Sequence, residues 1–200
     1  VESKLLGAHN GYNILASVTL AIVDGMETLK IKEGISKTRP PAGRLERVDV
    51  PASFKVLIDY AHTPEALNSV LSSLRELEYS KIITVFGAGG ERDRGKRAIM
   101  GMVVSELSDI TIVTTDNPRG EEPSSIIDDI FRGIEKEEGV HRIEDRGEAI
   151  REALNMAEEN DIVLIAGKGH ENYQEIRGER IHFSDKECVK EIFSDEESKN

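Results

Sequence analysis

The sequence predicts an α/β fold in which helices cover both faces of a mostly parallel sheet. From residue 55 onward, short apolar runs alternate with stretches of helical amphipathic spacing. Pro64 and Pro123 stand in the first turn of two of these stretches, where a missing N–H costs no hydrogen bond. Polar motifs follow four of the apolar runs, as ligand-binding loops do at the carboxyl ends of parallel strands.

The expected strands are the apolar runs at residues 55–60, 81–86, 109–115, 141–145 and 161–166. The expected helices between them cover residues 64–78, 95–107, 123–136 and 147–159. After the last strand, residues 174–183 predict a hairpin that turns near Arg177 and Gly178. A final helix over residues 184–193 begins at the N-cap Ser184, and residues 194–200 are expected to fray.

The chain before the first strand has a different pattern. Residues 9–25 predict a helix that stops at Gly25, and residues 26–35 predict a second, shorter helix. Residues 38–53 hold three of the six prolines and are typical of a linker. We therefore expect a helical segment over residues 1–37, followed by an α/β domain over residues 38–200.

The composition excludes several classes of function. The net charge of −12 argues against nucleic-acid binding, which needs clustered Lys and Arg. No apolar run approaches the roughly 20 residues of a membrane span, and the N-terminus has no signal-peptide pattern. The single cysteine, Cys188, excludes a disulfide framework and indicates a reducing cytoplasm. The five histidines are scattered, so we expect no metal site.

The loop GGERDRGKR, residues 89–97, resembles a phosphate-binding loop but departs from it. Arg97 stands where that motif needs Ser or Thr, and Arg92 stands where a dinucleotide fingerprint needs its third Gly. We expect Arg92 to bind a carboxylate, because a guanidinium makes planar bidentate contacts with that group. The loop's other cations, Arg94, Lys96 and Arg97, are interpreted as a solvated helix start paired with acidic neighbours.

Two further motifs suit a zwitterionic ligand, although each is also an ordinary turn. The motif DNPR offers the carboxylate of Asp116, an amide and a guanidinium within four residues. In GKGHE two glycines allow close backbone approach, and Glu171 can hold an ammonium group. Lys168 and His170 are acid–base candidates there, although a solvated loop histidine is commoner. In DYAHTP, Asp59 suits ribose hydroxyls while Thr63 caps a helix.

Together these motifs resemble the C-terminal part of the Mur ligase family over residues 9–193. The matching segments are HNGYN, PPAGRLE, VLIDYAHTPEAL, FGAGGERDRGKR, TTDNPRGEEP and AGKGHENYQ. The resemblance implies a Rossmann-like domain of a ligase that adds the third residue of the peptidoglycan stem peptide. In this reaction ATP phosphorylates the glutamate side chain of UDP-N-acetylmuramoyl-L-alanyl-D-glutamate, and a diamino acid attacks the acyl phosphate.

The resemblance also implies roles for individual residues. The diamino acid is held by Arg92, Asp116, Asn117, Pro118, Arg119, Gly167 and Glu171. ATP is contacted by Asn10, Asn13, Arg44, Asp59 and His62. Mg²⁺ and most of the ATP contacts belong to a central domain, of which residues 1–37 would be the helical end. We expect a cytoplasmic monomer that does not catalyse ligation with this chain alone.

Arg119 favours meso-diaminopimelate as the diamino acid. This substrate differs from lysine by one extra carboxylate, and lysine would leave a buried guanidinium unpaired. An unpaired charge costs at least ~1–3 kcal/mol, or roughly tenfold or more in preference. The alternatives are a lysine-adding ligase, a folylpolyglutamate synthetase, against which DNPR and GKGHE argue, and a non-catalytic amino-acid-binding module. A phosphate-binding loop upstream of residue 1 would distinguish the ligase from the module.

Overall fold

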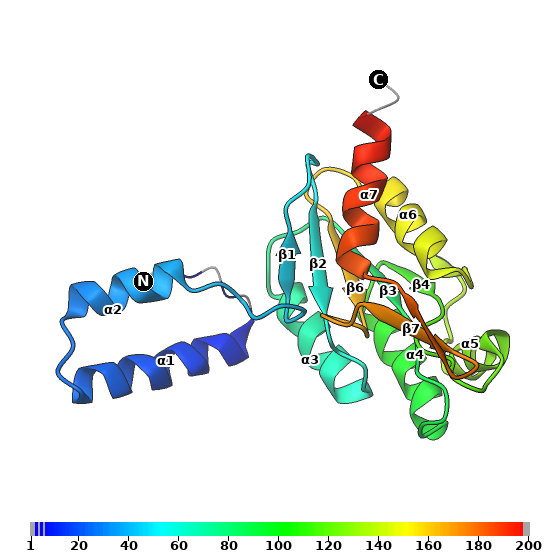
Figure 1. Ribbon diagram of the computed structural model, residues 1–200, viewed down its shortest axis with the longest axis horizontal. Helices are drawn as coiled ribbons and strands as arrows, with labels where there is room; N and C mark the ends of the chain where they lie inside the picture. The colour runs from blue at the N-terminus through cyan, green and yellow to red at the C-terminus, as the bar shows by residue number, and fades with distance from the viewer. Residues whose placement is uncertain (1–2, 4, 6, 198–200) are drawn as a thin grey trace. The chain divides into compact units, whose positions relative to one another are not determined.

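The computed structural model describes residues 3, 5 and 7–197 and divides into two compact units, Val1–Pro41 and Ala42–Asn200 (Figure 1). The first unit contains the two predicted helices, α1 (Ala8–Val23) and α2 (Thr28–Lys37), which contact each other. Gly25 lies between them with φ +79°, a conformation that glycine adopts without strain. None of the described helices could cross a membrane, given its length and polarity.

The second unit contains the predicted sheet. Its strands are β1 (Glu46–Val48), β2 (Lys55–Asp59), β3 (Ile82–Phe86), β4 (Ile110–Val113), β5 (Val140–Arg142) and β6 (Ile162–Ala166). Within the described residues the strand order is β1-β2-β6-β3-β4-β5, and every neighbouring pair is parallel except β1 with β2. The prediction of a mostly parallel sheet is confirmed.

The strand β1 corrects the prediction of a linker over residues 38–53. Its three residues pair with β2 at the edge of the sheet, and Val48 is buried there. A strand this short has no measurable alternation, and its place depends on a partner that lies later in the chain. The three prolines of residues 38–53 therefore favoured a linker over a strand in the prediction.

Helices cover both faces of the sheet, as predicted (Figure 1). The helices α3 (Pro64–Arg75), α4 (Gly95–Leu107) and α5 (Pro123–Phe131) form one layer, in which α4 contacts both neighbours. The helices α6 (Arg146–Met156) and α7 (Asp185–Glu197) cover the other face. There Ala149, Ile150, Val189 and Ile192 pack on alternate residues of the strands.

Several helix ends differ from the prediction, among them the end of α3, which stops at Arg75 rather than near residue 78. The helix α5 stops at Phe131 rather than near residue 136, and Gly133, which follows it, packs closely against the carbonyl of Ala98 in α4. The helix α6 stops at Met156 rather than at residue 159. The helix α7 continues to Glu197 rather than ending at residue 193, and no glycine or proline interrupts it; residues 198–200 lie outside the described part.

The C-terminal hairpin is confirmed as β7 (Tyr173–Ile176) and β8 (Glu179–His182). Arg177 and Gly178 form its two-residue turn, both with positive φ, as this type of turn requires. The hairpin is attached to the loop after β4 through Arg119. The N–H of Arg119 donates to the carbonyl of Glu175 over 2.9 Å, and the N–H of Arg177 donates to the carbonyl of Arg119 over 2.6 Å.

Candidate functional site

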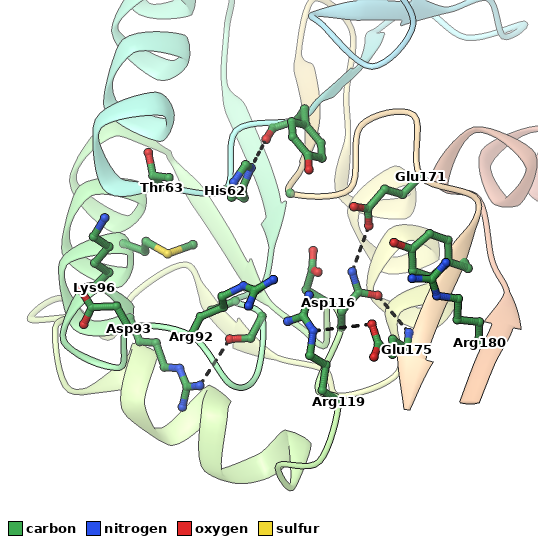
Figure 2. Close-up of a pocket in the computed structure, with 18 residues that line it drawn as sticks. His62, Thr63, Arg92, Asp93, Lys96, Asp116, Arg119, Glu171, Glu175 and Arg180 are labelled. Carbon is green, nitrogen blue, oxygen red and sulfur yellow. Dashed lines mark hydrogen bonds and ion pairs between the residues drawn. The ribbon is translucent and has the colours of Figure 1, made fainter. Parts of the chain in front are cut away.

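A cavity of about 500 Å³ opens where β2, β3, β4 and β6 end (Figure 2). The four loops that follow these strands and the β7–β8 hairpin contribute its wall. Six of the seven residues predicted to hold the diamino acid line it: Arg92, Asp116, Asn117, Arg119, Gly167 and Glu171. The seventh, Pro118, does not. The structure thus brings the four polar motifs together at one edge of the sheet.

The glycines after β3 allow close packing between two loops. A Cβ on Gly90 would lie 1.9 Å from the carbonyl oxygen of Pro118. The N–H of Gly90 donates to the carbonyl of Asn117 over 2.8 Å, and its carbonyl accepts from Arg119 Nη1 over 2.6 Å. The loop after β3 is therefore fixed against the DNPR loop.

The basic residues of this loop have different environments. Arg92 is exposed and lines the cavity, and Lys96 also lines it. Arg97 is only 1% exposed and forms ion pairs with Glu121 over 2.8 Å and with Asp129 over 2.9 Å. The prediction of a solvated charge is wrong for Arg97, because its acidic partners come from α5 and the segment before it rather than from its own loop.

Asn117 is the centre of a hydrogen-bond network in the cavity wall. Its Nδ2 donates to Glu171 Oε2 over 2.9 Å. Its Oδ1 accepts from Lys168 Nζ over 3.1 Å and from the backbone N–H of Glu175 over 3.0 Å. These contacts fix the orientation of the amide and join the DNPR loop, the GKGHE loop and the hairpin.

Asp116 is a buried carboxylate in the same wall. Burial raises the pKa of the Asp116 carboxyl, and the nearby charges of Arg146 and Lys168 offset part of the rise. Among the described residues its Oδ2 has no hydrogen-bond partner. Gly167, with φ +115°, approaches so closely that a Cβ there would lie 2.7 Å from this oxygen. An arriving ammonium group would satisfy it.

Arg119 has a left-handed backbone with φ 52° and a side chain that is 19% exposed. Besides its bond to the carbonyl of Gly90, its Nε lies 3.6 Å from Glu175 Oε2. Figure 2 shows the Arg119 and Glu175 side chains facing each other beside Asp116. The sequence did not predict Glu175, because nothing in this short polar stretch marks one half-buried glutamate as a partner of Arg119.

The two acid–base candidates of the GKGHE loop also differ. Lys168 is fully buried, and burial lowers the pKa of its ammonium group. Its Nζ contacts Asn117 and lies 3.5 Å from Glu171 Oε2 and 5.6 Å from the ring centre of Tyr173. His170 is exposed, with its ring 5.5 Å from that of Tyr60. Lys168 therefore supports the wall, whereas His170 lies outside the residues that line the cavity.

Three of the residues predicted to contact ATP lie near one another in the second unit, where the rings of His62 and Tyr60 are 4.6 Å apart. His62 lines the cavity. Asp59 accepts hydrogen bonds from the N–H groups of Leu45 over 2.7 Å and Ala61 over 2.8 Å, and it is buried. The exposed Arg44 lies over the ring of Tyr60 at 5.4 Å.

Asn10 and Asn13 belong to α1 in the first unit, where Asn13 Nδ2 donates to Asn10 Oδ1 over 3.2 Å. Within residues 3, 5 and 7–197, no group of three or more His, Cys, Asp and Glu side chains is arranged to hold a metal ion. The nucleotide contacts remain predictions.

A buried ion pair beneath the cavity was also missed. Arg146 and Asp185 are both fully buried, with Arg146 Nε 2.7 Å from Asp185 Oδ1. Arg146 also donates to the carbonyls of Ala166 over 3.0 Å and Thr115 over 3.5 Å, directly before two of the cavity loops. In the sequence Arg146 is one charged residue at a helix start, and its partner lies 39 residues later.

Comparisons with known proteins point to one family. Residues 43–169 match the family described as "Mur ligase, glutamate ligase domain". The chain is 45% identical, over 98% of its length, to the UDP-N-acetylmuramoyl-L-alanyl-D-glutamate–2,6-diaminopimelate ligase of Phocaeicola vulgatus. It is 47% identical, over 96% of its length, to the ligase of the same name from Aquifex aeolicus. It spans 41% and 39% of these two relatives.

Solved structures give the same result. A structure of a UDP-N-acetylmuramoyl-L-alanyl-D-glutamate–2,6-diaminopimelate ligase matches with a TM-score of 0.80 and 39% identity, covering 98% of this chain and 40% of the other. The UDP-N-acetylmuramate–alanine ligase of Thermotoga maritima matches with a TM-score of 0.68 over 99% of this chain and 40% of its own. At 22% identity, that second likeness concerns the fold alone.

Proposed function

Because the chain belongs to the Mur ligase family, in which it matches the glutamate ligase domain, we propose that it is the amino-acid-binding part of an ATP-dependent ligase. The ligase joins meso-diaminopimelate to UDP-N-acetylmuramoyl-L-alanyl-D-glutamate. Two relatives that are 45% and 47% identical carry this substrate pair in their names, which supports the assignment. The chain spans about 40% of their length, so the remaining parts of the reaction belong to the rest of such a ligase.

The observation that carries the proposal is the charge pattern at one end of the cavity. The guanidinium of Arg119 faces the same space as the carboxylates of Asp116 and Glu171. The distal end of meso-diaminopimelate carries one carboxylate and one ammonium group. It can therefore pair with the guanidinium and with the carboxylates of the cavity at the same time. The distal end of lysine carries the ammonium group but no carboxylate. With lysine bound, Arg119 would contact only its partners within the protein, Gly90 and Glu175.

In the proposed reaction, the side-chain carboxylate of the acceptor glutamate is first converted to an acyl phosphate by ATP. The free amine of the diamino acid then attacks the acyl carbon, and phosphate leaves. This chain orients the amine, because fixing the distal end of the diamino acid limits where the reacting end can lie. Arg92 binds a second carboxylate of the diamino acid.

The nucleotide contacts follow the family pattern in this proposal. ATP is met by Asn10, Asn13, Arg44, Asp59 and His62, while Mg²⁺ is bound mainly by the rest of the ligase. Residues 1–37 form the end of the ATP-binding domain, and residues 38–200 form the amino-acid-binding domain. We assign the reaction to the cytoplasm, where ATP is available, and to a monomer.

The test is an NMR titration of the chain with meso-diaminopimelate and, separately, with L-lysine. We expect saturable shifts at Asn117, Arg119 and Glu171 with meso-diaminopimelate, and roughly tenfold weaker binding of lysine. Arg119→Ala should abolish the preference. Arg177→Ala, an exposed change on the adjacent hairpin, is the matched control and should keep it. Equal response to both ligands in the unaltered chain would contradict the substrate assignment.

A further inference from the structure

Glu175 adds a carboxylate to the end of the cavity that contains Arg119. It stands on β7 and lines the cavity, with Oε2 3.6 Å from Arg119 Nε. Its backbone is fixed on both sides, since its N–H donates to Asn117 Oδ1 over 3.0 Å and its carbonyl accepts from the N–H of Arg119 over 2.9 Å. The side chain is therefore held within reach of the guanidinium.

The ion pair between these two side chains is loose. A hydrogen-bonded pair of this type lies at about 2.7–2.9 Å, whereas this one measures 3.6 Å with side chains that are 19% and 27% exposed. Arg119 also donates to the carbonyl of Gly90. A guanidinium has five N–H donors, so it can accept a ligand carboxylate without losing these contacts. Such a ligand would then lie beside Glu175.

Two other cations at this end, Lys168 and Arg180, have partners of their own. Lys168 contacts Asn117 and Glu171, and Arg180 lies over the ring of Tyr173 at 4.4 Å (Figure 2). A ligand carboxylate at Arg119 would therefore meet the negative charge of Glu175. An ammonium group on the ligand, next to that carboxylate, offsets this repulsion. It places a positive charge close to the carboxylates of the cavity wall.

We infer that Glu175 is a specificity-determining residue that selects ligands with an ammonium group beside the carboxylate bound by Arg119, and disfavours ligands with a plain carboxylate. The inference rests on the function proposed above and extends it to the distal amino group. Glu175 acts on discrimination between ligands, whereas Arg119 supplies the attraction for the carboxylate.

The experiment compares meso-diaminopimelate with 2-aminopimelate, which keeps both carboxylates but lacks one ammonium group. Dissociation constants are measured by titration of the 200-residue chain, of Glu175→Gln, and of Glu179→Gln as a matched control on the same hairpin. We expect the unaltered chain to prefer meso-diaminopimelate by roughly tenfold or more, and Glu175→Gln to reduce this ratio at least about threefold. Glu179→Gln should keep the ratio, because Glu179 is exposed and does not line the cavity.

Glu175→Asp serves as a second variant that keeps the charge, and it should retain most of the discrimination. An unchanged ratio in Glu175→Gln, with meso-diaminopimelate still preferred over lysine, would overturn this inference and leave the proposed function intact. Failure of the unaltered chain to bind meso-diaminopimelate would overturn both. The backbone spectrum of each variant confirms its fold, since the hydrogen bonds at residue 175 that anchor the hairpin are made by the backbone.

Discussion

At the scale of single residues, Arg97 and Glu121 show how a surface-like sequence can contain a buried ion pair. Arg97 is 1% exposed and contacts both Glu121 and Asp129. The hydrogen bonds from Arg97 and from the N–H of Glu91 lower the pKa of Glu121 to about 2. Glu121 therefore joins α4, the loop after β3 and the start of α5.

We expect Glu121→Gln to lower the free energy of unfolding at pH 7 by about 1–3 kcal/mol, because Arg97 loses a charged partner while remaining buried. The pKa of Glu121 is depressed in the folded state, so its contribution is complete above the ordinary value of 4.5 and disappears as the pH falls towards 2. Urea unfolding between pH 7 and pH 2 measures the difference between the two proteins, which should narrow over this window.

The control for this prediction is Glu122→Gln. Glu122 is the neighbouring residue, and its contact with Arg177 joins side chains that are 67% and 78% exposed. Exposed pairs of this kind contribute about 0–1 kcal/mol. A Glu121→Gln protein as stable as the unaltered one at pH 7 would show that Asp129 alone is sufficient for Arg97.

The residues of the site were predictable to different degrees. Arg92, Asp116, Asn117, Arg119 and Glu171 lie in the loops that follow strand ends, and the ends of parallel strands meet at one edge of a sheet. Their convergence therefore follows from the pattern along the chain. The partners Glu175 and Asp185 could not be found in this way, because each is selected by the packing of an element that lies far away in the sequence.

At the scale of elements, the packing of two loops depends on Gly90. A side chain there would meet the carbonyl of Pro118 at 1.9 Å, and the backbone of Gly90 makes hydrogen bonds to Asn117 and Arg119.

The long apolar strands and capped helices were predicted well because their signals are local. The edge strand β1 was not, because a three-residue strand is defined by its partner β2.

Gly90→Ala should therefore separate the loops after β3 and β4. We expect a loss of about 1–3 kcal/mol in the free energy of unfolding, because a methyl group cannot fit without backbone movement. Binding of meso-diaminopimelate should weaken as well, since Arg119 loses its fixed position. Urea unfolding and titration measure the two effects.

Gly34→Ala is the matched control for this change. Gly34 lies inside α2 with open space around its Cβ position, so the substitution should be neutral or stabilise the helix by up to about 1 kcal/mol. Equal stability of Gly90→Ala and the unaltered chain would mean that the two loops can move apart at no cost.

At the scale of the whole molecule, the chain consists of two units whose hydrophobic cores differ greatly in size. The second unit, Ala42–Asn200, has a sheet buried on both faces by helices. In the described part of the first unit, Ile31 is the buried apolar side chain, whereas Leu20, Val23 and Leu29 are 70%, 81% and 77% exposed. The helices of the first unit therefore gain little from burial within it.

This imbalance predicts how the units behave when they are separated. Residues 42–200 should unfold cooperatively, with a midpoint within a few degrees of that of the full chain, because their core is complete. A peptide of residues 1–41 should show little helix by circular dichroism, since short isolated helices are marginal in water. A much lower midpoint for residues 42–200 would instead show that residues 1–41 stabilise the second unit, and the boundary between domains would then have to be redrawn.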